Sequence, residues 1–280
     1  MGQIVAAFAT SHAPGITGFP ERAEPAQVEA VHGALRRLRE QLEAARPDAV
    51  VGISVEHFTN FFLSNLPTFC IGIADSYLSP ASQQFVEFLR VPQRTIPGHP
   101  ALGRALLEEA LRSGFDPAST AGDFGFDENF SVPFHFLMPE FEQALPVVPI
   151  IVNGVQPPFP TPRRCYQFGQ MLGRAIDRQT AAERVALVAT GGLSHWVGAP
   201  ESGQIVTEFD QRVLDLLRRG RGAEIAEWTD EQIEPAGNGA HEIRTWLVLA
   251  GAMGERPFEV LAYTPVPAWL TGMAVASVPV

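Results

Sequence analysis

The chain is poor in the features that mark secreted and membrane proteins. Its 280 residues include only two cysteines, Cys70 and Cys165, which form no CxxC pair and no disulfide framework. No segment approaches the roughly 20 apolar residues that cross a bilayer. The apolar run 4–9 is too short for the core of a signal peptide, and no basic stretch precedes it. We therefore expect a cytoplasmic protein that does not bind a membrane.

Positive charge is also scarce. The chain has 20 arginines, no lysine, and 31 aspartates and glutamates, which gives a formal net charge of −11. Because binding to nucleic acid or anionic lipid needs a basic surface, neither is an expected partner. A hydrophobic fraction of 46% with 18% charged residues is typical of a folded enzyme. We find no internal repeat and no linker, so residues 1–280 are interpreted as a single domain.

Hydrophobic patterns predict alternating strands and helices. Short apolar runs predict strands, and apolar residues spaced by three and four predict helices. The predicted strands are 4–9, 49–55, 147–152, 185–189 and 258–263. The predicted helices are 25–45, 100–112, 161–178, 204–219 and 239–252. This order predicts an α/β fold with a mostly parallel central sheet and helices on both faces.

Three histidines share a position in this architecture. His12 follows the first predicted strand, His57 follows the second, and His195 follows the strand 185–189 through a short loop. Ligands of open α/β sheets bind beyond the carboxyl ends of the strands. If the strands are parallel neighbours, the three imidazoles converge at that edge, whereas a single histidine there could merely cap a loop.

Glu242 adds a carboxylate to this set. It lies in the predicted helix 239–252 on the face of Trp246, so we expect it to point into the core. A buried carboxylate needs a partner, which is either a metal ion or an arginine such as Arg244 or Arg104. Two histidines and one carboxylate form the facial set that holds Fe(II) with open coordination positions. The same residue types also hold zinc for hydrolysis.

Several short motifs in a fixed order resemble one known family. They are Ser11-His12, Glu56-His57-Phe58 with Asn60-Phe61-Phe62, Phe69-Cys70-Ile71-Gly72, Asn153-Gly154-Val155-Gln156-Pro157-Pro158, Gly191-Gly192-Leu193-Ser194-His195, His241-Glu242-Ile243-Arg244-Thr245-Trp246 and the tail from Tyr263 to Gly272. Each motif is weak alone, but the ordered set resembles the class III, LigB-type extradiol ring-cleavage dioxygenases. The resemblance runs nearly end to end.

The resemblance implies a function and assigns roles. It implies a dioxygenase that opens the ring of a catechol-like or aminophenol-like aromatic substrate with O₂. His12, His57 and Glu242 become the ligands of Fe(II), and His195 becomes an acid–base residue that moves protons on the substrate. The resemblance also implies a homo-oligomer, and some relatives use a small accessory subunit.

One position departs from the family pattern. The family usually carries an Asp-His-Gly triplet whose histidine is a second acid–base residue, whereas this chain has Asp127-Glu128-Asn129. Glu128 either replaces that histidine as a base, binds a donor on an altered substrate such as an amine, or marks a loss of ordinary catechol cleavage. An ionised carboxylate accepts hydrogen bonds but donates none. The alternatives to the dioxygenase are accordingly a zinc-dependent hydrolase or lyase, and a non-catalytic metal-binding subunit.

The remaining histidines are given structural roles. His32 and His99 are expected at the surface, and His135 is expected to open a helix, in a core or capping role. His241 is expected to orient Glu242 or to cap its helix.

Overall fold

The computed structural model describes residues 1–140 and 144–280. The strands are β1 (Gln3–Thr10), β2 (Ala49–Ser54), β3 (Phe69–Gly72), β4 (Ser76–Ser79), β5 (Arg94–Pro97), β6 (Ala118–Thr120), β7 (Val147–Val152), β8 (Arg184–Thr190), β9 (Glu259–Val266) and β10 (Thr271–Ser277). The α-helices are α1 (Gly15–Gly18), α2 (Pro25–Ala45), α3 (Gln83–Leu89), α4 (Pro100–Arg112), α5 (Glu128–Leu137), α6 (Pro162–Arg178), α7 (Thr207–Arg218), α8 (Gly222–Ile225), α9 (Asp230–Ile233) and α10 (Ile243–Met253). Short 3-10 helices are η1 (Pro20–Arg22), η3 (Glu234–Ala236), η4 (Asn238–Glu242) and η5 (Pro267–Trp269).

The described strands form an 8-stranded sheet and a separate two-stranded sheet of β4 and β5. The order in the large sheet is β6-β3-β7-β2-β8-β1-β10-β9. The four central strands, β7, β2, β8 and β1, pair in parallel. Antiparallel pairing begins on both sides, where β3 pairs with β7 and β10 pairs with β1. The predicted mostly parallel sheet is thus confirmed, and the antiparallel flanks were not predicted.

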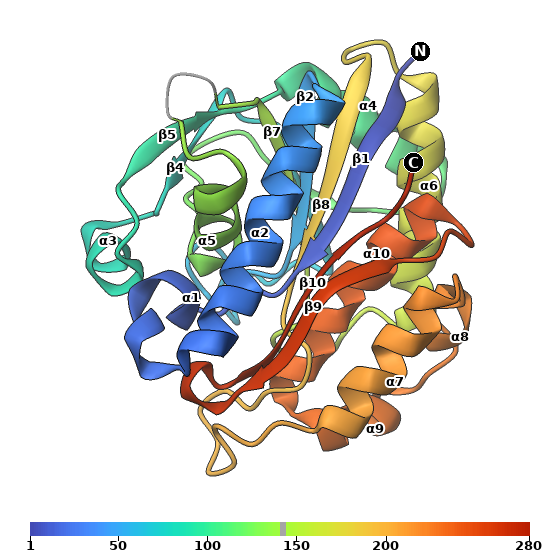
Figure 1. The fold of residues 1–280 in the computed structure, drawn as a ribbon. Coiled ribbons are helices and arrows are strands. Elements are labelled where there is room, and N and C mark those ends of the chain that lie inside the picture. The colour runs from blue at the N-terminus through green and yellow to red at the C-terminus, as the bar shows by residue number, and fades with distance from the viewer. Residues whose placement is uncertain (141–143) are drawn as a thin grey trace.

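Helices cover both faces of this sheet, as the sequence predicts (Figure 1). Successive residues of a strand point to opposite faces, and Val50 and Val51 of β2 accordingly belong to two different core clusters. The Val51 side is covered by α4, α6 and α10, and the Val50 side by α2 and α5. Because both faces are covered, β2 and β7 are buried along their whole length.

The central strands end level with one another, which positions the loops that follow. Thr10 at the end of β1 pairs with Thr190 at the end of β8, and Ile53 of β2 pairs with Ala189. The three loops that leave β1, β2 and β8 therefore begin at the same edge of the sheet. This is the edge at which the sequence predicts a site.

The helix predicted over 239–252 begins later than expected. Residues Asn238–Glu242 form the 3-10 helix η4, and α10 starts at Ile243. Glu242 therefore lies at the boundary between the two elements rather than inside the α-helix. Its predicted inward direction is confirmed, because only 2% of its surface is exposed.

No helix within residues 1–140 and 144–280 combines the length and the apolar character needed to cross a membrane. Within the same residues both cysteines are free thiols, and both are buried.

Candidate metal centre

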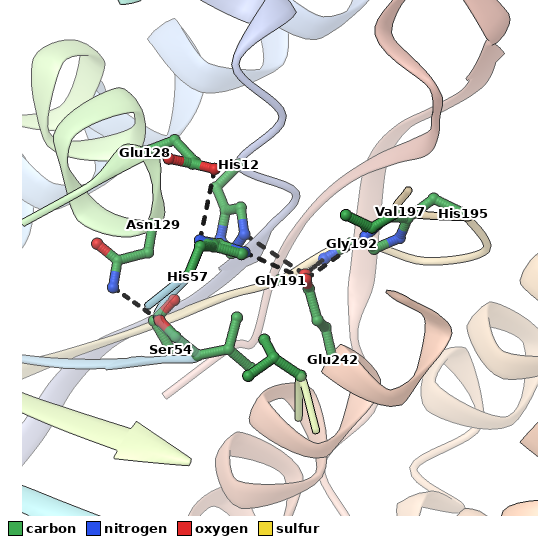
Figure 2. Close-up of polar contacts among 12 residues, drawn as sticks. His12, Ser54, His57, Glu128, Asn129, Gly191, Gly192, His195, Val197 and Glu242 are labelled. Carbon is green, nitrogen blue, oxygen red and sulfur yellow. Dashed lines mark hydrogen bonds and ion pairs between the residues drawn. The ribbon is translucent and has the colours of Figure 1, made fainter. Parts of the chain in front are cut away.

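Four side chains from distant parts of the sequence meet at the carboxyl edge of the sheet. His12 follows β1, His57 follows β2, His195 follows β8, and Glu242 ends η4. Figure 2 shows the Glu242 carboxylate with His12 and His57 on one side and His195 on the other. The structure thus brings together all four residues that the sequence analysis singled out at this edge.

The distances among these groups suit a shared ion. Nε2 of His12 lies 3.4 Å from Oε2 of Glu242, and Nε2 of His57 lies 3.4 Å from Oε1. One ligand atom from each of His12, His57 and Glu242 lies within 4.8 Å of the other two. His195 is not part of this set, although its Nε2 also lies 3.4 Å from Oε1 of Glu242.

A threonine fixes the tautomer of His12. Nδ1 of His12 lies 3.1 Å from Oγ1 of Thr190, at the end of β8. The Thr190 hydroxyl donates its proton to the backbone carbonyl of Asn129 over 2.7 Å. It therefore accepts a hydrogen bond from Nδ1–H of His12, which leaves the lone pair of Nε2 facing Glu242.

Asp127 fixes the orientation of the His57 imidazole. Oδ1 of Asp127 lies 3.2 Å from Nδ1 of His57, and Oδ2 accepts from the His57 backbone N–H over 2.8 Å. Asp127 is also the N-cap of α5, where it accepts from the backbone N–H of Asn129. The helix terminus is thereby tied to the orientation of the imidazole, and Nε2 of His57 faces Glu242.

The geometry directs one nitrogen of each imidazole at the carboxylate. Nε2 of His12 and Nε2 of His57 both point at Glu242, an arrangement in which all three side chains can bind one cation. Oε2 of Glu242 already accepts from the backbone N–H of Gly192 over 2.5 Å. The residue set therefore fits a divalent ion held by two nitrogens and one oxygen.

Of the two predicted partners of Glu242, a metal ion or an arginine, the arginine is wrong. Neither Arg244 nor Arg104 forms an ion pair with Glu242 in the described part of the chain. The guanidinium of Arg244 instead donates to Asp230 and to Nδ1 of His241. The described neighbours of the Glu242 carboxylate are thus imidazoles and not an arginine, and imidazoles together with a carboxylate are a donor set for a metal ion.

The electrostatics of the centre are dominated by burial and by mutual contacts. Burial lowers the pKa of His12 to about 4, which keeps its imidazole neutral at physiological pH. Burial by itself would raise the pKa of Glu242, but His195 and His12 hold it well below its usual value. Burial would lower the pKa of His195, but Glu242 raises it above the ordinary histidine value. Burial would also lower the pKa of His57, but Glu128 and Asp127 raise it well above the ordinary value. His57 therefore has to release a proton when it binds a metal, whereas His12 and Glu242 are already in their metal-binding forms.

Glu128 lies directly beside the centre, on the side of His57 (Figure 2). Its Oε1 is 3.5 Å from Nδ1 of His57, and burial raises the pKa of Glu128 to about 7. Its Oε2 is buried and has no hydrogen-bond partner among the described residues. The indole Nε1 of Trp196, the residue after His195, is likewise buried without a partner.

Two cavities reach the centre. The first, of about 250 Å³, is lined by all four residues of the centre together with Glu128 and Trp196. The second, of about 330 Å³, is lined by Phe58, Val155 and Asn238 among others. The two linings share His57, Val197 and Glu242, so the candidate ion site is accessible from two directions.

Sequence reasoning missed three residues of this site. Asp127 and Thr190 orient the two imidazoles, and Trp196 lines the first cavity. Asp127 had a recognisable signal, because an aspartate before a helix is a typical N-cap. Thr190 and Trp196 carry no such signal, since their roles depend on which neighbours the fold supplies.

The other histidines are more involved in packing than predicted. His32 is half-buried, donates from Nε2 to the carbonyl of Ile16 and stacks near Trp269, so its predicted surface position is wrong. His99 is half-buried as well and caps the N-terminus of α4. His135 is half-buried in the last turn of α5, so its predicted place at the opening of a helix is wrong.

His241 is buried and stacks on Phe159 with ring centroids 4.3 Å apart. It holds Arg244 rather than Glu242, so the predicted role in orienting the glutamate is wrong.

Comparison with known proteins adds independent observations. The model of the family described as the catalytic LigB subunit of aromatic ring-opening dioxygenase matches residues 6–274. The chain is 28% identical to 2,3-dihydroxyphenylpropionate/2,3-dihydroxicinnamic acid 1,2-dioxygenase of Klebsiella pneumoniae (strain 342), with 94% of each chain covered. It is 27% identical to the protein of the same name from Escherichia coli O139:H28, over 94% of each chain.

The fold also matches a solved structure. An uncharacterized protein of Escherichia coli K12 superposes with a TM-score of 0.63 over 98% of this chain and 100% of that one, at 16% sequence identity. At this identity the likeness concerns the fold alone.

Proposed function

The chain belongs to the family of catalytic LigB subunits of aromatic ring-opening dioxygenases, and from this premise we propose that it is an Fe(II)-dependent, extradiol-type enzyme. Its substrate is a catechol-like or aminophenol-like aromatic compound whose ring it opens with O₂. The observation that carries the proposal is the meeting of His12, His57 and Glu242, with ligand atoms within 4.8 Å of one another, at the mouth of a cavity.

These three residues hold the ion in the proposed enzyme. Two neutral imidazoles and one carboxylate leave several coordination positions open, which is the arrangement that non-heme iron oxygenases use. Bound Fe(II) supplies the route by which electrons pass from the aromatic ring to O₂. Thr190 and Asp127 keep the two Nε2 atoms directed at the ion.

His195 is the proposed base. Its Nδ1–H donates to the carbonyl of Leu193 over 3.1 Å, so its Nε2 is the nitrogen that takes up a proton. That nitrogen lies 3.4 Å from Glu242, and the side chain lines the same cavity. The imidazole can therefore accept the proton that a hydroxyl group of the substrate loses and return it to the product.

Glu128 is the proposed second polar contact to the substrate. Its unpartnered Oε2 can accept a hydrogen bond from a hydroxyl or an amino group of the substrate. Glutamate in place of the family's histidine thus favours a substrate that offers a donor near the ion. This includes 2-aminophenols as well as catechols.

The test is reconstitution with Fe(II) under nitrogen followed by oxygen-uptake assays on catechols and 2-aminophenols. The parent protein should bind about one Fe(II) per chain and consume O₂ with at least one compound, because the three ligands bind one ion. The single variants His12→Ala and Glu242→Ala should lose most bound iron. His135→Ala is the matched control, since His135 lies in α5 outside the centre, and it should bind iron as the parent does.

Two results would contradict the proposal. If His12→Ala and Glu242→Ala both kept their full iron content, these residues would not be the ligands of the ion. Turnover that is independent of oxygen and supported by zinc would replace the dioxygenase by a hydrolase or lyase at the same residues.

A further inference from the structure

Two polar atoms in the wall of the first cavity lack partners. Oε2 of Glu128 and Nε1 of Trp196 are buried and form no hydrogen bond within the described residues. Buried polar atoms are nearly always paired, and an unpaired one costs free energy. A ligand is one way to supply the missing partners, because both side chains line the same space.

Trp196 offers a donor only, because an indole has no acceptor atom. Its ring is half-buried and lies in the irregular segment between β8 and α7, next to His195. The nitrogen is covered in this structure, so rotation of the indole is needed to turn its N–H toward a ligand. A carbonyl, amide or ether oxygen of the substrate would satisfy it.

Arginine and lysine are absent from the described lining of this cavity. The chain contains no lysine at all. Among the described residues that line the cavity there is no arginine, and the acidic side chains are Glu128 and Glu242. The remaining titratable groups are the three imidazoles of the centre, and those of His12 and His57 are oriented toward Glu242 by Thr190 and Asp127.

The imidazole of His195 is also engaged, so it cannot pair with a charged group on a substituent away from the candidate ion. Its Nδ1 donates to the carbonyl of Leu193, and its Nε2 faces Glu242. The described lining thus offers no arginine or lysine to pair with a carboxylate on a substituent of the substrate, and its imidazoles are engaged at the candidate ion site. Much of the remaining wall is apolar, with Pro14, Trp269 and Leu270. A carboxylate brought into such a space loses its hydration without gaining a cation.

We propose that this cavity selects an aromatic substrate whose ring substituent is uncharged and carries a hydrogen-bond acceptor, and that Trp196 is the residue that recognises this acceptor. The inference rests on the proposed function, because it concerns the substrate of that same site. It separates this chain from relatives named for 2,3-dihydroxyphenylpropionate, a compound with a carboxylate. The separation lies in the substituent and leaves the chemistry at the ring unchanged.

The experiment compares two ligands that differ at one group. They are 2,3-dihydroxyphenylpropionate and its primary amide, titrated by calorimetry into the Fe(II)-loaded protein under nitrogen. The amide should bind at least about tenfold more tightly, because the carboxylate must be desolvated without a cationic partner. Binding is measured without turnover, and oxygen uptake is recorded separately.

Two tryptophan variants test whether Trp196 is the residue that recognises the acceptor. Trp196→Phe should weaken binding of the amide by about tenfold, which is the usual worth of one hydrogen bond. It should also remove the change in tryptophan fluorescence that accompanies binding of the amide. Trp228→Phe is the matched control, since Trp228 packs on Phe209 away from the cavity, and it should leave both readouts unchanged.

A gain-of-function variant tests the charge argument. Leu270 lines the cavity and is 46% exposed, so a long side chain fits there without burial. Leu270→Arg supplies the missing cation and should reverse the preference in favour of the carboxylate. Leu270→Gln, a polar but neutral replacement, should keep the preference for the amide.

The outcomes are separable from those of the proposed function. Equal or tighter binding of the carboxylate by the parent, or an unchanged affinity for the amide in Trp196→Phe, overturns this inference even if the protein consumes oxygen. A preserved preference for the amide in a protein that consumes no oxygen with any diol supports the recognition and overturns the dioxygenase.

Discussion

At position 190 a hydroxyl group decides which nitrogen of His12 faces the candidate ion. The Thr190 hydroxyl donates to the carbonyl of Asn129 and accepts from Nδ1 of His12. A side chain of the same shape without the hydroxyl would leave the imidazole free to adopt either tautomer. The hydroxyl of residue 190 therefore serves both the orientation of His12 and the pairing of the buried Asn129 carbonyl.

Thr190→Val should lower the affinity for Fe(II) by about tenfold, which is the usual cost of losing an outer contact to a metal-binding histidine. The fold should persist with a loss of about 1–3 kcal/mol of stability, because valine leaves the buried carbonyl of Asn129 without the hydroxyl that donates to it. Fluorescence or calorimetric titration with Fe(II) under nitrogen measures the change. Thr264→Val, on the edge strand β9, is the control. An affinity equal to that of the parent would show that Thr190 does not orient His12.

Residues of the site could be predicted where two signals coincide, namely a residue type that binds metals and a position directly after a strand. His12, His57 and His195 each follow a central strand, and this alone suggested that they meet. The partner of Glu242 was not predictable from its helical neighbours, because the three imidazoles reach it from other elements. Arg244 lies two residues away from it and turns instead to Asp230.

At the scale of elements, α10 is held against α6 by a close contact between backbones. A Cβ atom added at Gly169 would overlap the carbonyl oxygen of Val248. The absence of a side chain at position 169 lets the two helices approach. Since η4 leads directly into α10, the position of Glu242 depends on this packing.

Gly169→Ala should lower the free energy of unfolding by about 1–3 kcal/mol, because the added methyl group must push the helices apart. The affinity for Fe(II) should fall as well, because Glu242 moves with α10. Thermal unfolding and metal titration measure the two effects. Gly33→Ala in α2 is the control, because the added Cβ has only the flexible ends of Glu29 and Arg36 within 4 Å. This variant should be neutral or more stable by about 0.5–1 kcal/mol. Equal stability of the two variants would exclude a close contact at Gly169.

Long elements with a clear period were predicted from the sequence, and short ones were not. The helices α2 and α4 begin and end where their apolar spacing and their terminal residues predict. The strands β3, β4, β5, β6 and β10 were missed. The first four have only three or four residues each, and β10 combines small residues with an irregular pattern. The 3-10 helix η4 continues the helical period, which explains why the start of α10 was placed too early.

At the scale of the whole molecule, the sheet is what makes a site out of scattered residues. Because β2, β8 and β1 are parallel neighbours, the residues that follow them share one edge. That edge gathers several histidines and carboxylates in a buried region, and protonation there is coupled to folding. The coupling can be measured without interference from metal binding at a histidine that lies outside the candidate metal centre.

His135, in the last turn of α5, is such a residue. Burial lowers its pKa below the ordinary value of 6.5, and Arg94 and His32 lower it further. Its ring also contacts Phe136 edge-on, with centroids 5.5 Å apart. The folded protein therefore binds a proton at His135 less readily than the unfolded chain does. Stability from this residue is present above the unfolded pKa of about 6.5 and is lost as the pH falls toward the lower folded value.

His135→Gln should consequently flatten the dependence of stability on pH, since glutamine does not titrate. Between about pH 7 and pH 5 the parent should lose more free energy of unfolding than the variant does, because only the parent gains a proton at this position on unfolding. Urea denaturation at a series of pH values, with equal metal content in both proteins, measures the two slopes. The difference between them isolates His135 from His12 and from the other titrating groups of the centre. Parallel slopes would mean that His135 takes up its proton equally in the folded and unfolded chains, and that its environment in α5 is more hydrated than its burial indicates.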